Sequence, residues 1–228
     1  MSRCILIYGQ PAAGKSFSLR NLDASATVII DADLKGALPW RGSRTQYSKD
    51  KRNFFSVNSL DTIYKTVKTI GESAEWANVT TLIIDGFNNA MMSEVLFYDD
   101  KNAPKNKFEK YDEVAKKTVR IIDTAQKLRD DLTIVFTAHV ETADPYVAGD
   151  VDKVFTPGKY LKDKIKVESK FNYVFYAKTE ENEFFFETAP FKSTARSPHE
   201  CFPSRIPNDI KSAIETITKY EEGATTND

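Results

Sequence analysis

Short apolar runs alternate along this chain with segments in which apolar residues recur at helical spacing. The strand-like runs lie at residues 4–8, 27–31, 54–57, 80–85 and 132–137. Helical spacing is clearest at 60–70 and 114–128, and a shorter helix-like run covers 17–22. Near-continuous apolar strands that alternate with helices are typical of a parallel sheet covered on both faces. The pattern therefore predicts an α/β core of three layers.

The pattern changes after His139. Residues 141–164 contain prolines and glycines and show little periodicity, so we expect a long loop there. Two runs rich in Phe and Tyr, 172–177 and 183–188, flank the polar residues 180–182. Alternating runs of this kind around a short polar break predict an antiparallel hairpin.

Apolar residues at helical spacing between Ile210 and Tyr220 predict a final amphipathic helix. Hydrophobic residues make up 41% of the 228 residues, which is enough to bury one core of domain size. We therefore expect a single domain over residues 1–221 and a flexible tail over 222–228.

The net charge of −1 argues against a generally basic nucleic-acid coat protein and leaves room for a local basic face. No apolar run approaches the ~20 residues that span a bilayer. The chain enters its first strand at once, with no room for a secretion signal. We expect a cytoplasmic protein that does not contact membranes.

The most specific signal is a complete G-x-x-x-x-G-K-S phosphate-binding loop. It consists of Gly9, Gln10, Pro11, Ala12, Ala13, Gly14, Lys15 and Ser16, and Phe17 follows. A strand before the loop and a helix after it are the context that the motif needs. Loop amides then face phosphate oxygens, Lys15 reaches the β- and γ-phosphates, and the Ser16 hydroxyl binds Mg²⁺. The sequence predicts that residues 9–17 bind a nucleoside triphosphate, without a motif that separates ATP from GTP.

Acidic residues end two of the predicted strands. Asp85 has the form of a Walker B acid and is predicted to hold Mg²⁺ together with Ser16; capping of a turn is the alternative. Asp31 and Asp33 end an earlier strand, and carboxyl ends of parallel strands meet at one edge of a sheet. We expect the Asp33 carboxylate to orient or deprotonate the water that attacks the γ-phosphate. A solvated turn acid or helix cap is the other interpretation, and it fits Asp31 better.

His139 follows the apolar run that ends at Thr137 and Ala138. A polar side chain at this position can touch the γ-phosphate and report its loss to the following loop. The alternative is a hydrogen-bonded residue at the end of a strand. His199 lies among polar residues and is interpreted as surface.

These motifs resemble those of a known family. Residues 30–33 followed by 37–39 resemble the segment of bacterial RecA-type recombinases that carries their catalytic acid. Residues 135–139 are similar to the strand whose end carries their γ-phosphate sensor, where a histidine stands here. Nearly the whole chain, with its hairpin and the turn at 202–210, resembles phage-encoded RecA-like ATPases that act as single-strand annealing proteins.

The resemblance implies a RecA-like P-loop NTPase core with a C-terminal antiparallel hairpin and helix, which hydrolyses ATP with Mg²⁺. Asp33, Lys15 and His139 are then its catalytic residues. It also implies binding of single-stranded DNA in recombination, strand annealing or recombination-dependent replication. The expected partners are further copies of the chain, in a ring or filament, and phage single-strand-binding or replication proteins in the host cytoplasm. RecA filaments form through a segment ahead of the core, which we do not see here, so we do not expect that route.

Two segments combine lysines with aromatic residues, as single-strand binding requires. The first consists of Lys101, Lys105, Lys107, Phe108, Lys110, Tyr111, Lys116 and Lys117. The second consists of Lys153, Phe155, Lys159, Tyr160, Lys162 and Lys164. The alternative for both is an ordinary solvated face. Candidates for a cation acting on a neighbouring subunit are Lys159, Lys162, Lys192 and Arg196.

Three other functions stay open at this point. A small-molecule or nucleoside kinase needs an arginine-bearing lid and an acceptor pocket, whereas the loop after His139 carries lysines and aromatics. A helicase loader or packaging-type motor would act on a protein partner. A nucleotide-gated binding module would have negligible turnover, which the pair Asp33 and Asp85 argues against.

Overall fold

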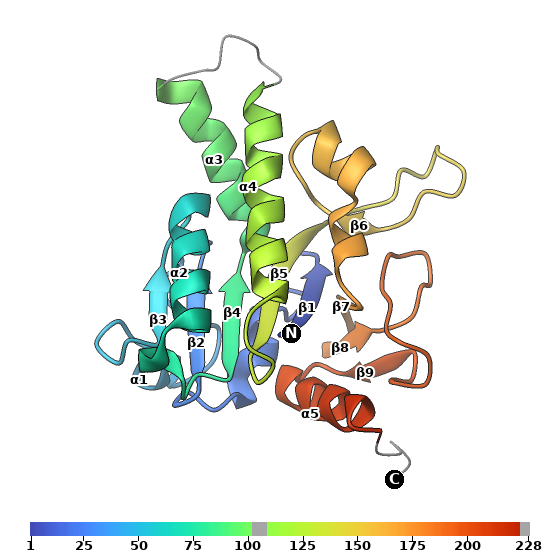
Figure 1. The fold of residues 1–228 in the computed structure, drawn as a ribbon. Helices are drawn as coiled ribbons and strands as arrows, with labels where there is room; N and C mark the ends of the chain where they lie inside the picture. Colours follow the sequence, from blue (N-terminus) through green and yellow to red (C-terminus); the bar gives the residue numbers. More distant parts are fainter. Residues whose placement is uncertain (102–108, 224–228) are drawn as a thin grey trace.

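The computed structural model describes residues 1–101 and 109–223, and the side chains of all of these except 99–101. The described strands form one nine-stranded sheet in the order β3-β2-β4-β5-β1-β7-β8-β9, with β6 beside β5 (Figure 1). The strands are β1 (Arg3–Gly9), β2 (Thr27–Asp31), β3 (Phe54–Ser56), β4 (Thr81–Asp85), β5 (Thr133–Glu141), β6 (Lys153–Val154), β7 (Tyr173–Glu180), β8 (Glu183–Glu187) and β9 (Arg205–Pro207). The helices are α1 (Ser43–Gln46), α2 (Leu60–Glu72), α3 (Phe87–Lys101), α4 (Glu109–Gln126) and α5 (Ile210–Glu221), with shorter turns η1 (Ser16–Asn21), η2 (Ala74–Trp76), η3 (Tyr160–Ile165) and η4 (Val167–Lys170).

The strands from β3 to β7 along this order run parallel, and β8 and β9 continue the sheet antiparallel. Strand β5 lies between β1, which leads into the phosphate loop, and β4, which ends in Asp85. The carboxyl ends of the parallel strands all reach the same edge of the sheet, where ligands bind in open α/β folds. This edge therefore receives both the phosphate loop and the acid.

Each parallel strand buries side chains on both of its faces. Leu6 of β1 belongs to the core on one side of the sheet and Ile5 to the core on the other. Helices α2, α3 and α4 cover the first face, and η1 and α5 cover the second (Figure 1). The predicted architecture is confirmed: a mostly parallel sheet between helices, extended by a C-terminal antiparallel hairpin and helix.

The predicted hairpin is formed by β7 and β8, and its two turn residues, Glu181 and Asn182, both have positive φ angles. Two positive φ angles in a two-residue turn match the right-handed twist of the paired strands. Strand β7 pairs in parallel with β1 on its other side. The hairpin therefore lies beside the phosphate loop.

The long loop predicted for residues 141–164 is wrong in part. Strand β5 continues through His139 to Glu141, β6 returns along it, and η3 follows. The tyrosine hydroxyls of Tyr8 and Tyr176 bind Asp152 from neighbouring strands, which fixes this segment to the sheet. The sequence did not reveal this ordered structure. Prolines and glycines interrupt the segment, and side chains from other strands hold it in place.

Helices α1 and α3 were not predicted from the sequence. In α3 the buried residues Phe87, Ala90, Met91 and Val95 face the core, but polar residues separate them and weaken the periodic pattern. Most of the predicted tail at 222–228 lies outside the described residues. Among the residues that are described, no helix combines the length and the apolar character required to cross a bilayer.

Candidate functional site

A cavity of about 730 Å³ opens at the carboxyl edge of the sheet. Its wall contains Lys15, Asp33, Asp85 and His139, which come from four separate segments of the chain. The pairing of the strands explains their meeting: Gly9 at the end of β1 lies opposite His139 of β5. The structure thus brings the predicted catalytic and metal-binding residues together, while their chemical roles stay predictions.

The phosphate loop is closed around its own lysine. Lys15 Nζ donates to the carbonyl oxygens of Gly9 at 2.9 Å and Gln10 at 2.8 Å. Burial lowers the pKa of Lys15 to about 8, against the opposing charge of Asp85. Gly14 adopts a φ angle of +83°, which L residues rarely adopt, and this lets the chain turn sharply into η1. A bound phosphate would compete with these carbonyls for the ammonium group.

The helix after the loop, η1, is a 3-10 helix of six residues that lies within one residue of the predicted run at 17–22. Its contacts come from the C-terminal part of the chain, where the Arg20 guanidinium donates to the carbonyl oxygen of Asn208 at 2.7 Å. The rings of Phe17 and Phe184 lie 5.6 Å apart, and Phe184 also approaches the position where Gly14 lacks a side chain. The hairpin and the turn before α5 therefore support the phosphate loop.

Asp85 is fully buried at the end of β4. Thr137 Oγ1 donates to Asp85 Oδ1 at 2.5 Å and accepts a hydrogen bond from the Gly86 amide at 2.8 Å. Burial raises the pKa of Asp85, although hydrogen bonds from Thr137 and Ser16 act in the opposite direction. A cation beside a buried carboxylate of this kind stabilises its charged form, which burial alone disfavours.

Asp33 lies two residues beyond the end of β2, and its side chain is only 5% exposed. Asn89 Nδ2 donates to Asp33 Oδ1, and Lys35 Nζ forms an ion pair with Asp33 Oδ2. Gly86, directly after Asp85, contacts the same carboxylate. Each oxygen of Asp33 is therefore oriented by a separate donor at the cavity wall.

Asp31 has a different position. Its carboxylate accepts hydrogen bonds from the backbone amides of Lys35 at 3.3 Å and Gly36 at 2.8 Å and from the Ser56 hydroxyl at 3.0 Å. These bonds close the turn that carries Asp33, and Asp31 does not line the cavity. Of the two interpretations of Asp31, the geometry fits the turn acid.

His139 lies within β5, whereas the sequence predicted that it follows the end of the strand. Its backbone amide donates to Asn88 Oδ1 at 2.9 Å. Burial lowers the pKa of the imidazole, and the positive charges of Lys15 and Lys35 lower it further. Nδ1 is buried and has no hydrogen-bond partner within residues 1–101 and 109–223. A neutral imidazole at this place can donate to or accept from a ligand in the cavity.

The chemistry of the site fits Mg²⁺ bound with a nucleotide. The Ser16 hydroxyl lies close enough to Asp85 to lower the pKa of its carboxyl group, so one hydroxyl and one carboxylate lie near each other. Over the described part of the chain, no group of three or more His, Cys, Asp or Glu could hold a metal by itself. Mg²⁺ usually takes one or two protein ligands and completes its shell with phosphate oxygens and water.

Several residues of this site were missed from the sequence. They are Lys35, Asn88, Asn89, Thr137 and Phe184, all of which line the cavity or contact its acids. Asn88 and Asn89 follow Asp85 closely, and polar residues directly after a Walker B acid are a signal that the sequence offered. Phe184 gave no such signal, because only the parallel pairing of β7 with β1 brings the hairpin to the phosphate loop.

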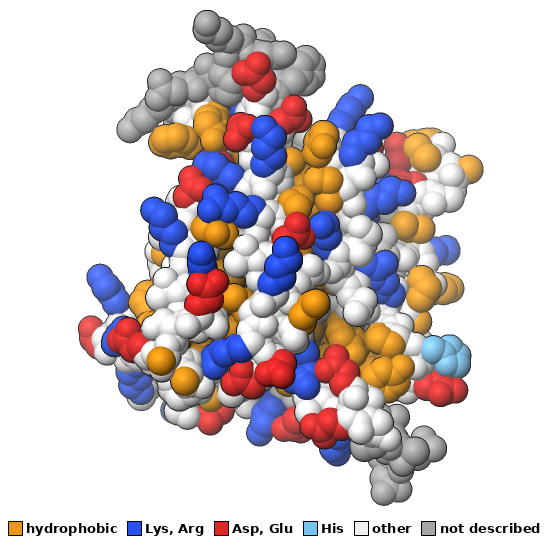
Figure 2. All heavy atoms as spheres, in the orientation of Figure 1, with side chains coloured by type: hydrophobic (Ala, Val, Ile, Leu, Met, Phe, Trp, Pro, Cys, Tyr) orange, Lys and Arg blue, Asp and Glu red, His pale blue; other side chains and the backbone are white. Residues whose placement is uncertain are grey.

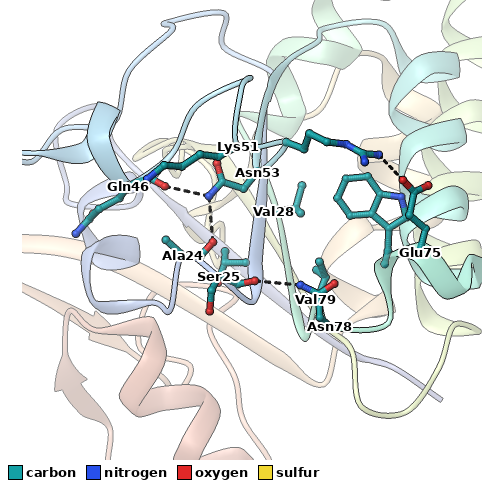
Figure 3. Close-up of a pocket in the computed structure, with 12 residues that line it drawn as sticks. Ala24, Ser25, Val28, Gln46, Lys51, Asn53, Glu75, Asn78 and Val79 are labelled. Atoms are coloured by element: carbon teal, nitrogen blue, oxygen red, sulfur yellow. Dashed lines mark hydrogen bonds and ion pairs between the residues drawn. The ribbon is translucent and has the colours of Figure 1, made fainter.

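A second hollow, of about 380 Å³, lies near the start of β2, away from the phosphate loop (Figure 3). Asn53 donates there to the carbonyl oxygens of Ala24 and Gln46, each at 3.0 Å. Arg52 forms an ion pair with Glu75 and lies over a tryptophan ring. Asn53, Arg52 and Glu75 of this hollow thus already have partners within the protein.

The lysines that were predicted to bind nucleic acid fall into three groups: paired with acids, exposed, and outside the described residues. Lys117 binds Glu94 and Asp61, Lys153 binds Asp150, and Lys162 binds Glu141. Lys159, Tyr160 and Lys164 are exposed in and before η3. Lys105, Lys107 and Phe108 lie outside the described residues. Arg196, a candidate for a cation acting on a neighbour, binds the carbonyl oxygen of Phe171 and is part of the framework.

Comparisons with known proteins bear on the same features. A family model described as an AAA domain matches residues 1–207. Among solved structures, the flagellar accessory protein FlaH from Methanocaldococcus jannaschii is similar with a TM-score of 0.43 and 13% sequence identity, over 90% of this chain and 83% of that chain. No curated protein matches the sequence.

Proposed function

Because this chain belongs to the AAA domain family, with its P-loop ATPase fold, we propose that it is a Mg²⁺-dependent ATPase acting on single-stranded DNA. Its role is in recombination, strand annealing or recombination-dependent replication, as its resemblance to phage RecA-like proteins implies. It works as a homo-oligomer alongside the single-strand-binding or replication proteins of a phage.

The observation that carries the ATPase proposal is the shared cavity of Lys15, Asp33, Asp85 and His139. In this mechanism the loop amides and Lys15 neutralise the phosphates, and Ser16 and Asp85 hold the metal. Mg²⁺, when bound, offsets charge on the β- and γ-phosphates. Asp33 orients the attacking water and accepts its proton, while His139 senses the γ-phosphate.

Support for a nucleic-acid surface comes from the groove between α4 and η3. This groove, of about 500 Å³, is lined by Lys116, Arg120, Lys127 and Tyr160 among others. Figure 2 shows basic side chains around an apolar strip on this face. Lysines neutralise phosphates and an exposed ring stacks on unpaired bases, with ~1–3 kcal/mol per stacked base. The groove thus offers both features that a single strand needs.

The decisive experiment measures ATP turnover with and without single-stranded DNA over a series of salt concentrations. We expect stimulation by DNA that falls steeply as salt rises, because lysine–phosphate contacts release counterions. Lys15→Ala should abolish nucleotide binding or turnover, whereas Lys127→Ala with Tyr160→Ala should remove only the stimulation. Turnover that requires a small phosphoryl acceptor and ignores DNA would point to a kinase.

A further inference from the structure

Lys35 was not a candidate from the sequence, yet it lies in the wall of the nucleotide cavity. Its ammonium group forms an ion pair with Asp33, the residue assigned to the attacking water. The second oxygen of Asp33 is held separately by Asn89. Lys35 can therefore leave the carboxylate without releasing it from its position.

The backbone around Lys35 is fixed, whereas most of its side chain is exposed. The Lys35 and Gly36 amides both donate to the buried carboxylate of Asp31. The Lys35 side chain is 59% exposed, in contrast with 5% for Asp33. A lysine stem has four rotatable carbons, so its charged end can shift by several ångströms from a fixed base. This arrangement suits a cation that exchanges one partner for another.

The charges at the cavity make such an exchange favourable. Of the described residues, Lys15 and Lys35 alone bring a lysine or arginine to the cavity wall. Lys15 is buried in the phosphate loop, where it is predicted to reach the β- and γ-phosphates. The positive charge of Lys35 also acts on Lys15, Asp85 and His139, which places its ammonium group beside the same end of the cavity. A polyanionic phosphate chain attracts an ammonium group more strongly than a single carboxylate does.

We propose that Lys35 is a second phosphate-binding cation, which pairs with Asp33 in the free protein and moves to the γ-phosphate when a triphosphate binds. This inference rests on the proposed ATPase function and adds a residue to it. The exchange frees one oxygen of Asp33 to accept the proton of the attacking water. The water oxygen then bonds to the γ-phosphorus as the bond to ADP breaks, and Lys35 keeps its proton throughout.

The test is equilibrium binding of two probes, Mg²⁺ with a non-hydrolysable ATP analogue and Mg²⁺ with ADP. Lys35→Gln should weaken binding of the analogue about tenfold or more, the size expected for one charge-assisted hydrogen bond. Binding of ADP should stay within about twofold of the parent, because ADP has no γ-phosphate. Lys35→Arg should retain most of the preference for the triphosphate.

Lys68→Gln is the matched control, since Lys68 is 50% exposed and is paired with Glu72 on α2, outside the cavity wall. Asp33→Asn should leave analogue binding equal to the parent or tighter, because it removes the competing partner. An unchanged ratio of analogue to ADP affinity in a folded Lys35→Gln variant would overturn the proposal, whatever happens to turnover. If the parent chain binds neither probe, the ATPase function itself fails, which is a separate outcome.

Discussion

Asp33 Oδ1 occupies the space into which a side chain at Gly86 would have to extend. A Cβ atom at position 86 would overlap both this oxygen and the carboxyl carbon of Asp33. Gly86 also has a φ angle of +84°, and it directly follows Asp85 at the end of β4. The turn after β4 is therefore shaped to receive the Asp33 carboxylate from the turn after β2.

We expect Gly86→Ala to displace Asp33 and reduce ATP turnover by about 10²-fold, the cost of moving a reacting group by roughly 1 Å. The matched control is Gly36→Ala, because Gly36 has a φ angle of +68° and a Cβ there would meet nothing within 4 Å. Both variants bear the strain of a left-handed alanine, about 1 kcal/mol of the free energy of unfolding. Equal turnover in the two variants would show that the contact with Asp33 does not matter.

Asp33→Asn keeps the size of the side chain and removes its ability to accept a proton. We expect nucleotide binding to be retained and hydrolysis to fall by about 10²–10⁴, the usual range for loss of a general base. Asp31→Asn serves as the comparison, because Asp31 is bonded to the turn and does not reach the cavity. The assignment fails if Asp33→Asn hydrolyses ATP as fast as the parent.

Much of the fold could be predicted because its strands are buried on both faces. Runs such as residues 27–31 and 80–85 have an unbroken apolar centre, and they correspond to β2 and β4 within one residue. The carboxyl end of a parallel strand then gives the position of an acid such as Asp85 before any coordinates are known. Helix α3 escaped detection because its buried positions are interrupted by asparagine, serine and acidic residues.

The contacts that orient the site could not be predicted in the same way. Thr137 and Asp85 are 52 positions apart in the chain, and they meet because β4 and β5 are neighbours in the sheet. Likewise, Asn89 reaches Asp33 only because β2 lies on the other side of β4. Local sequence gives the end of each strand, whereas the order of the strands decides which ends meet.

Thr137 offers a test of the hydrogen bonds around Asp85. Thr137→Val removes the hydroxyl but keeps the shape, so the buried carboxylate and the Gly86 amide each lose a partner. We expect the free energy of unfolding, measured by urea denaturation without nucleotide, to fall by about 1–3 kcal/mol. Thr137→Ser retains the hydroxyl and should lose clearly less. A valine variant as stable as the parent would mean that these groups find other partners.

His139 predicts a dependence of stability on pH. Burial and the charges of Lys15 and Lys35 lower its pKa in the folded protein from the usual 6.5. Below pH 6.5 the unfolded chain therefore binds a proton at His139 that the folded chain does not bind. The folded state is then penalised as pH falls, and the penalty grows until the pH reaches the folded-state pKa.

Replacing His139 by asparagine removes this penalty. The difference in free energy of unfolding between His139→Asn and the parent should therefore increase in favour of the variant as pH is lowered from 7.5 to about 5.5. His199→Asn is the control, because the His199 side chain is 92% exposed and lies outside the wall of the cavity. A difference that stays constant with pH, or that matches the His199 control, would show that the imidazole of His139 titrates normally.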